Sequence, residues 1–286
     1  MTSEEKKPLI LFECKTHNAY SFKILIDVLN YYLNKKGSFL VNSGGIFLCN
    51  TNPKEDVLCD LKLLSENFQE YFLFKNQTIC FSINLNTFYN EMLKKIKKKD
   101  AITLQIMRED DDRMYIKVTK ESVDNKDNHV SAKAAVLETK HIPMSPPEGY
   151  GQPINILSKI FQQSCREITR PSNKEIEVTC WNEKTIRFYA SKDGVVENEA
   201  VFGSRQNEQK ETRCETFKDK CPAAHIVRPA KLAGLGETVK IFVKKDLPLR
   251  YKMRVGCLGD IEIYIKTVEQ VKSEKDTNDD EGDTNK

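Results

Sequence analysis

The chain has 286 residues and a mass of 33.0 kDa, a length that fits one large domain or two domains of about 140 residues each. Hydrophobic residues make up 39% and charged residues 30%, so we expect a packed core beneath a heavily charged surface. No apolar run reaches the roughly 18 residues of a membrane helix, and the first residues lack the apolar stretch of a signal peptide. These features predict a soluble, intracellular protein that has no membrane partner.

Cysteines and charges follow uneven patterns along the chain. The nine cysteines are scattered without a Cys-x-x-Cys pair, which predicts reduced core residues rather than disulfides. Residues 273–286 hold six acidic residues and two lysines, a local charge of −4, so the rest of the chain carries +7. Because the acidic end has no aromatic residue, we predict a disordered tail over residues 271–286. The basic body hints at a polyanionic partner.

The first half of the chain begins with an amphipathic helix over residues 22–33. Its predicted buried stripe is Phe22, Leu25, Ile26, Leu29 and Leu33, and the polar side carries Lys23, Asp27, Asn30 and Asn34. Strand-like runs separated by turn-forming residues follow at 38–41, 46–49, 57–63 and 79–85. A second helix is predicted at about 87–98, with Phe88, Met92 and Ile96 inward. Ile102–Met107 and Met114–Val118 then form a predicted hairpin around Arg108–Arg113.

The second half repeats this order. A third amphipathic helix places Leu157, Ile160, Phe161, Ser164 and Ile168 inward and Lys159, Gln163, Arg166 and Arg170 outward. Predicted strands follow at 176–180, 186–190 and 201–203. A short helix near 223–232 precedes strands at 239–243, 249–255 and 260–266.

Matching elements of the two halves lie about 137 residues apart, which predicts an internal duplication. The connections are too short for crossovers, so we expect two α+β domains with antiparallel sheets. The predicted domains are residues 1–135 and 154–270. Between them, residues 136–153 form a connecting loop rich in proline and glycine.

The predicted helices share a basic polar side. Taken singly, such residues are best explained as a solvated surface, but their recurrence on four pseudo-symmetric helices favours one common basic surface. Lysine and arginine at this spacing bind phosphates in a salt-sensitive way, without reading base sequence. The residues are Lys23, Lys94, Lys97, Lys98, Lys159, Arg166, Arg228 and Lys231.

Two groups could instead bind a metal in a nucleic-acid enzyme. Asp110–Asp112 is a run of three carboxylates, but it suits a polar hairpin turn better. Cys214, Cys221 and His225 are spaced irregularly for zinc, and core cysteines with a surface histidine explain them as well. No nucleotide-binding glycine loop or hydrolase motif accompanies them. We therefore predict no catalytic residue, no metal and no cofactor, and a protein that is not an enzyme.

Several segments resemble one family in their order along residues 10–267. They are Phe12-Glu13, Ser43-Gly44-Gly45-Ile46-Phe47-Leu48, Phe81–Leu85 leading to Met92-Leu93-Lys94, Asp100–Leu104, Leu247–Tyr251 and Gly259–Ile265. With the duplicated halves, they identify the chain as resembling the proliferating cell nuclear antigen (PCNA) family of DNA sliding clamps, in a divergent form that suits a large DNA virus or an atypical eukaryote.

The resemblance implies a ring, usually of three chains, whose helices line a hole around duplex DNA. The helix residues that would face DNA are Lys23, Lys94, Arg166 and Lys231, with Lys97, Lys98, Lys159 and Arg228 beside them. Asn30 and Gln163 replace basic residues that family members often have. Subunits would pair through edge strands near 130–137 and 200–205.

The resemblance also implies an apolar pocket for a partner peptide with aromatic anchors. The matching residues are Thr51, Lys140, Ile142, Pro143, Pro248, Tyr264 and Lys266. Thr51, Lys140 and Lys266 depart from the usual residue types and would change the peptide preference. Near the lysine that ubiquitin modifies in many eukaryotic members, this chain has Asn182.

Together these features predict a clamp that encircles duplex DNA without sequence preference and gives a DNA polymerase its processivity. The expected partners are a DNA polymerase, other proteins with clamp-interacting peptides, a clamp loader and two further copies of the chain. The expected location is the nucleus, or a viral DNA replication compartment. The alternatives are a monomeric or dimeric clamp-fold factor that grips DNA, the metal-dependent enzyme, and an interaction scaffold that no longer encloses DNA.

Overall fold

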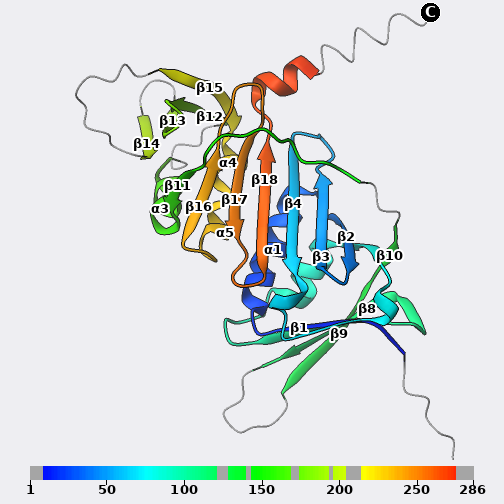
Figure 1. Ribbon diagram of the computed structural model, residues 1–286. Helices are drawn as coiled ribbons and strands as arrows, with labels where there is room; N and C mark the ends of the chain where they lie inside the picture. The colour runs from blue at the N-terminus through cyan, green and yellow to red at the C-terminus, as the bar shows by residue number, and fades with distance from the viewer. Residues whose placement is uncertain are drawn as a thin grey trace, which may run out of the picture. The chain divides into compact units, whose positions relative to one another are not determined.

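The computed structural model describes residues 9–120, 128–139, 143–168, 174–192, 196–203 and 214–274 (Figure 1). The chain divides into two compact units, each made of three stretches of sequence. No helix among the described residues is both long and apolar enough to cross a bilayer. The first unit comprises Met1–Asn50, Asp60–Met144 and Val255–Asp260, and the second Thr51–Cys59, Ser145–Arg254 and Ile261–Lys286.

Antiparallel strands, one long helix and several short helical segments form the first unit. Its elements are β1 (Ile10–Thr16), α1 (Ala19–Tyr32), β2 (Lys36–Asn42), β3 (Gly45–Thr51), β4 (Val57–Leu64), η1 (Ser65–Asn67), β5 (Glu70–Leu73), η2 (Phe74–Asn76), β6 (Ile79–Asn84), α2 (Leu85–Thr87), η3 (Phe88–Leu93), β7 (Ala101–Met107), β8 (Asp110–Thr119), β9 (His129–Ala135) and β10 (Leu137–Glu138). One sheet has the strand order β5-β1-β7-β8-β9, and the other strands follow the order β10-β6-β2-β3-β4.

The second unit is built in the same way. Its elements are β11 (Ile154–Leu157), α3 (Ser158–Ile168), β12 (Glu175–Trp181), β13 (Thr185–Lys192), β14 (Val196–Gly203), β15 (Glu215–Pro222), α4 (Ala223–Val227), α5 (Ala230–Ala233), β16 (Thr238–Phe242), β17 (Leu249–Arg254) and β18 (Gly259–Ile265). Residues 268–274 add a short helix. The strand orders are β14-β13-β12-β15 and β18-β17-β16-β11.

The strand orders confirm the predicted internal duplication. The order β1-β7-β8-β9 corresponds to β11-β16-β17-β18, and β6-β2-β3-β4 corresponds to β15-β12-β13-β14. The strand pairs are antiparallel, as in the pairing of Leu104 with Ile116 and of Ile241 with Tyr251. The predicted class, α+β with antiparallel sheets, is therefore confirmed.

Strands β4 and β18 each contribute residues to both units, and within each unit their segments lie side by side. In the first unit the Leu64 N–H donates to the Leu258 carbonyl over 3.0 Å, and in the second the Lys266 N–H donates to the Asp56 carbonyl over 2.9 Å. By the duplication, β14 is the counterpart of β4 and β9 the counterpart of β18. Among the strands of the described residues, both β14 and β9 end their sheets.

Helix α1 confirms the first predicted helix but is buried more completely than an amphipathic surface helix. Leu25, Ile26 and Leu29 are fully buried, as predicted, and so is Val28. Asp27 is only 8% exposed, so its prediction as an outward polar residue is wrong. The helix lies behind the strands of its unit in Figure 1 and packs on β2.

The other three predicted helices are shorter or broken. The second consists of α2 followed by the π-helical η3, which ends at Leu93, so Lys97 and Lys98 follow the helix instead of lying on it. The third is α3, but Leu157 ends β11 and is 59% exposed, and Ile160 is 51% exposed, so neither is an inward residue. The fourth is divided into α4 and α5 at Pro229, whose ring cannot donate a helical hydrogen bond.

All nine cysteines are free, as predicted. Cys14, Cys59, Cys165, Cys180 and Cys221 are buried, whereas Cys214 and Cys257 are exposed, so the description as core residues holds for only part of the set. Burial raises the pKa of the Cys165 thiol to about 12. That thiol therefore stays protonated near neutral pH and does not act as a thiolate nucleophile.

Candidate DNA face and partner site

In the first unit, the predicted basic residues come together where α1 meets the end of η3. The Lys23 ammonium on α1 donates to the Lys94 carbonyl over 2.6 Å and to the Ile96 carbonyl over 3.0 Å. The ammonium groups of Lys23 and Lys98 each lie 5.8 Å from the centre of the Tyr20 ring. Lys94, Lys97 and Lys98 are exposed, whereas Lys23 is half-buried. Lys23 thus holds the lysine-rich segment in place and keeps little freedom to bind a phosphate itself.

We expect Lys23→Met to lower the free energy of unfolding by about 1–2 kcal/mol, because two carbonyls lose a charged donor at a partly exposed site. Lys23→Arg keeps donors at this position and should lose less. Urea denaturation of each purified variant measures the change. The matched control is Lys159→Met, which removes an exposed lysine of α3 and should cost under about 0.5 kcal/mol. Equal losses in the lysine-to-methionine pair would contradict the anchoring role of Lys23.

In the second unit, the predicted basic residues lie on helices that pack together. The Gln162 side chain on α3 donates to the Ala230 carbonyl at the start of α5 over 2.8 Å. Lys159 and Arg166 on α3 and Lys231 on α5 are exposed, and Arg228 between α4 and α5 is half-buried. Gln163 donates to the Glu167 carboxylate over 3.1 Å. Their binding to DNA stays a prediction.

Four of the predicted partner-site residues belong to the second unit, where they lie at strand ends. Thr51 ends β3, Pro248 precedes β17, Tyr264 lies in β18 and Lys266 follows it. Tyr264 is only 3% exposed. Pro143 is an exposed residue of the first unit, and Lys140 and Ile142 lie outside the described residues.

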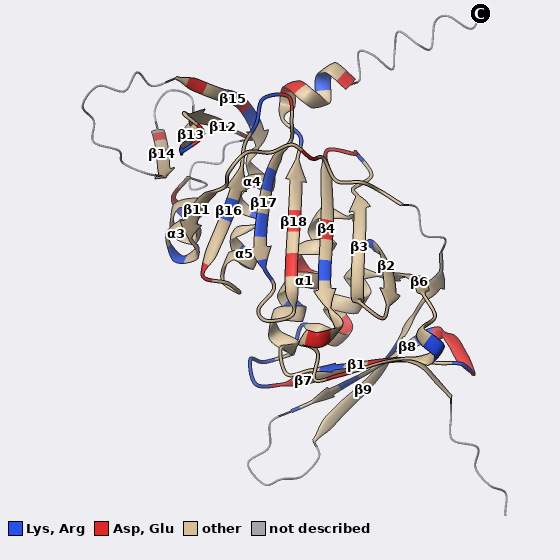
Figure 2. Cartoon of the chain, in the orientation of Figure 1, with Lys and Arg blue, Asp and Glu red and all other residues tan. Residues whose placement is uncertain are grey.

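The Tyr264 hydroxyl is held by a charged network on β17 and β18. It donates to the Glu262 carboxylate over 2.7 Å, and that carboxylate also binds Arg250 at 2.7 Å and Lys252 at 3.0 Å. Burial alone would raise the pKa of Glu262, but the hydrogen bonds from Tyr264 and Lys252 and the charge of Arg250 outweigh it, so the pKa is lowered. Figure 2 shows the basic residues of β17 beside the acidic residues of β18.

Tyr150 and Arg250 are residues of this site that the sequence did not reveal. The Tyr150 hydroxyl donates to the Pro248 carbonyl over 2.7 Å, and its ring centre lies 6.2 Å from that of Tyr264. The Arg250 guanidinium lies against the Tyr150, Tyr264 and Phe242 rings. The only sequence signal for Tyr150 is that it is the single aromatic residue in the proline-rich connector, and Arg250 carries no such signal.

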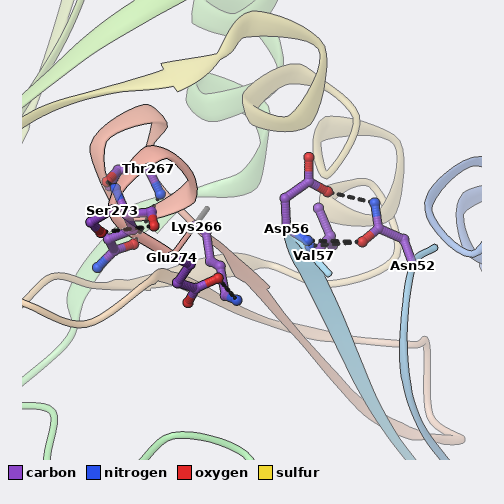
Figure 3. A network of polar contacts seen from close by, with 8 residues as sticks. Asn52, Asp56, Val57, Lys266, Thr267, Ser273 and Glu274 are labelled. Carbon is purple, nitrogen blue, oxygen red and sulfur yellow. Dashed lines mark hydrogen bonds and ion pairs between the residues drawn. The ribbon is translucent and has the colours of Figure 1, made fainter. Parts of the chain in front are cut away.

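A second polar network borders Lys266, and Figure 3 shows its two parts. The Asn52 side-chain oxygen accepts from the backbone N–H groups of Asp56 and Val57 over 3.0 and 3.1 Å. The Lys266 ammonium binds the Glu274 carboxylate of the C-terminal helix at 2.6 Å. His225 Nε2 on α4 lies 3.7 Å from Asp56 Oδ2, and its hydrogen bond is the main cause that lowers the pKa of Asp56. Because the Lys266 N–H also donates to the Asp56 carbonyl, Asp56 connects the end of β18 to His225 on α4.

The two alternative metal groups are dispersed or engaged elsewhere. Asp110 starts β8 and binds Tyr115, Lys133 and Arg113, so the turn of the β7–β8 hairpin is the shorter Arg108-Glu109. Cys214 is exposed before β15, Cys221 is buried in it and His225 faces Asp56. Within the described ranges, no three His, Cys, Asp or Glu side chains gather in a way that could hold a metal ion.

A duplicated α+β chain with antiparallel sheets and basic helix-borne residues in both halves has the architecture of a DNA clamp. Residues 11–141 match the family model of the proliferating cell nuclear antigen N-terminal domain. The resemblance predicted from the sequence is therefore confirmed.

Two curated relatives support the same family. A protein of Acanthamoeba polyphaga mimivirus, named as a probable DNA polymerase sliding clamp, is 22% identical over 229 residues, which are 80% of this chain and 48% of that protein. A protein of Paramecium bursaria Chlorella virus 1, named as a probable DNA polymerase sliding clamp 1, is 23% identical over 265 residues, 91% of this chain and 97% of that protein. The chain thus spans about half the length of the mimivirus relative and nearly all of the chlorella virus relative.

Proposed function

We propose that the chain is a DNA sliding clamp, a non-enzymatic factor that encloses duplex DNA as a homotrimer and tethers a DNA polymerase to its template. The PCNA domain at residues 11–141 and the two viral relatives support the class. A clamp loader would open the ring, and the nucleus or a viral replication compartment would be its place of action. Repair enzymes would bind the same partner site as the polymerase.

Ring closure is supported by the ends of the sheets, and this observation carries the proposal. Strand β4 lies beside β18, while their counterparts β14 and β9 each end a sheet. An unpaired strand edge is a template for pairing with another chain. If β9 of one chain pairs with β14 of the next, the contact between the two chains repeats the β4–β18 pairing.

Exposed apolar side chains accompany both free edges. On β9, Val130 is 54% exposed, and on β14, Val201 is 53% exposed. Leu157 on β11 and Ile160 on α3 are also exposed, and both elements pack against β14. Apolar side chains gathered at an open strand edge favour burial in a subunit contact. This contact would explain why the apolar stripe of α3 extends to residues that its own unit leaves uncovered.

The lysines after η3 would make loose phosphate contacts that let the ring slide. We expect the combined Lys94→Gln, Lys97→Gln and Lys98→Gln variant to bind duplex DNA more weakly, with a slope of log affinity against log salt shallower by up to about 2.7, or 0.9 per phosphate contact. Fluorescence anisotropy across a salt series measures it. The control replaces the exposed Lys36, Lys75 and Lys117 of the same unit by glutamine. An identical loss of DNA affinity in the control would mean that the net charge of the chain determines binding, and not the position of Lys94, Lys97 and Lys98.

Topological retention tests the function directly. Protein placed by a loader on nicked circular DNA should stay bound in high salt and should leave when the circle is cut, because an enclosing ring escapes only over a free end. Equal retention on both DNA forms, with steep salt dependence and no need for a loader, would favour an open factor that grips DNA. A native mass near three chains is expected in the same buffers.

A further inference from the structure

The connector reaches the partner site through Tyr150. In the described part of the connector, residues 145–153 form no helix or strand, yet two contacts fasten them to the second unit. The Tyr150 hydroxyl donates to the Pro248 carbonyl over 2.7 Å, and the Lys244 ammonium donates to the Gly149 carbonyl over 2.6 Å. The Tyr150 ring is half-buried, and burial raises its pKa, so the hydroxyl remains a donor at neutral pH.

Tyr150 completes an aromatic cluster, defined here as Tyr150, Phe242, Arg250, Glu262 and Tyr264. The Tyr150 ring centre lies 6.1 Å from that of Phe242 and 6.2 Å from that of Tyr264. The Arg250 guanidinium lies 4.3 Å from the Phe242 ring centre, 5.3 Å from that of Tyr150 and 5.6 Å from that of Tyr264. Aromatic rings around a guanidinium attract one another and the cation. The cluster therefore holds the Tyr150 ring against two other rings and a cation.

The members of the cluster differ in how firmly they are held. Phe242, Arg250, Glu262 and Tyr264 belong to β16, β17 and β18, whose hydrogen-bonded ladder fixes them. Tyr150 comes from a segment without regular structure and is held by side-chain contacts and two hydrogen bonds. Of the five residues, Tyr150 is thus the one that can leave without breaking a sheet.

The burial of Tyr264 means that its ring is not accessible to a partner's aromatic side chain. Tyr264 is only 3% exposed, and its hydroxyl is used by Glu262. A partner peptide that buries an aromatic anchor against the Tyr264 ring needs a free ring face, and the Tyr150 ring packs there. Two aromatic rings cannot occupy the same position.

We propose that Tyr150 occupies the position of the partner's aromatic anchor and that a partner segment binds by displacing it. The inference rests on the proposed partner site and adds a specificity requirement. A partner must supply an aromatic ring able to replace Tyr150 above Arg250. A segment whose ring binds the cluster more weakly than Tyr150 does would not displace it. The apparent affinity is lowered by the fraction of chains in which Tyr150 has left the cluster.

The test measures the affinity of the full-length protein for a fluorescein-labelled peptide that carries two adjacent phenylalanines. The same peptide with alanines in place of the phenylalanines is the reference. Tyr150→Ala should bind the phenylalanine peptide about tenfold more tightly than wild type, because no occupant has to leave. Tyr150→Phe keeps the ring and loses the hydrogen bond to Pro248, and should gain about threefold. Glu148→Ala, an exposed connector change outside the cluster, is the matched control and should bind like wild type.

Hydrogen exchange supplies an independent readout that does not depend on a variant. Adding the phenylalanine peptide to wild type should speed amide exchange in residues 145–153, since the segment loses its contacts. Slower exchange there, or weaker or unchanged peptide binding by Tyr150→Ala, would overturn the proposal and make Tyr150 a wall of the site. Absence of peptide binding by every variant would also overturn it, and retention on circular DNA would then leave the clamp function standing. Tighter peptide binding by Tyr150→Ala, together with no retention of the protein on circular DNA, would support the displacement of Tyr150 and contradict the proposed clamp function.

Discussion

Val130→Glu or Val201→Glu is expected to convert the trimer into single chains at micromolar concentration. Each substitution places a charge on a strand edge that the proposed ring buries, and an unpaired carboxylate costs several kcal/mol at such a contact. Because Val130 and Val201 are 54% and 53% exposed in the single chain, its own stability should change by under about 0.5 kcal/mol. Light scattering measures the mass, and retention on nicked circular DNA should be lost together with it.

Phe72→Glu is the matched control for the edge variants. Phe72 is 48% exposed on β5, which ends the opposite side of the same sheet as β9. The proposed ring leaves this edge open, so the variant should keep both the trimer mass and DNA retention. A trimer that persists in Val130→Glu and Val201→Glu, or that is lost equally in Phe72→Glu, would sink the β9–β14 contact. Val136 is unsuitable for this test because it is only 4% exposed, and a charge there would damage folding.

Much of the fold could be predicted because its signals are local. Alternating apolar residues indicate a half-buried strand within a few residues, as Val239 and Ile241 do on β16, where both are fully buried. Turn-forming residues separate β2 from β3 in the same way. The duplication followed from comparing the two halves, so it required no knowledge of long-range contacts.

The errors arose where tertiary packing overrides a local pattern. Leu157 matched a helical period, but it ends β11, where Ile154 and Ile156 supply the buried face. Asp27 matched a polar helix face, yet α1 is covered on more than one side. Several strands, β1, β5, β11 and β15 among them, were not predicted because they pair with strands distant in sequence.

The candidate sites show the same limit. The basic residues were recognisable from their recurrence on successive helices, but nothing in the sequence indicated that Lys23 would donate to the carbonyls of Lys94 and Ile96. The position of Tyr150 depends on Pro248, 98 residues away. Contacts between unstructured segments and distant strands leave no periodic signal.

Glu262 is expected to contribute more to stability than any other single carboxylate of the partner site. Its side chain is 11% exposed and is shared by Arg250, Lys252 and the Tyr264 hydroxyl. Glu262→Gln removes the charge that compensates two cations, and a broken ion pair at this depth costs about 3 kcal/mol. Urea denaturation at pH 7 measures the loss. Glu215→Gln, at an exposed position at the start of β15, should cost under about 0.5 kcal/mol.

The pH dependence of the unfolding free energy distinguishes the contribution of the Glu262 charge from that of its packing. The pKa of Glu262 is lowered in the folded protein from an ordinary value of 4.5, so the unfolded chain takes up a proton first as the pH falls. The stabilisation is therefore fully present well above pH 4.5 and is lost as the pH falls through the lower, folded-state value. The difference in unfolding free energy between wild type and Glu262→Gln should be constant from about pH 6 to 8 and should shrink in acid. A difference that stays the same down to pH 3 would assign the loss to packing, and Arg250 would then need no counter-charge to hold the aromatic cluster together.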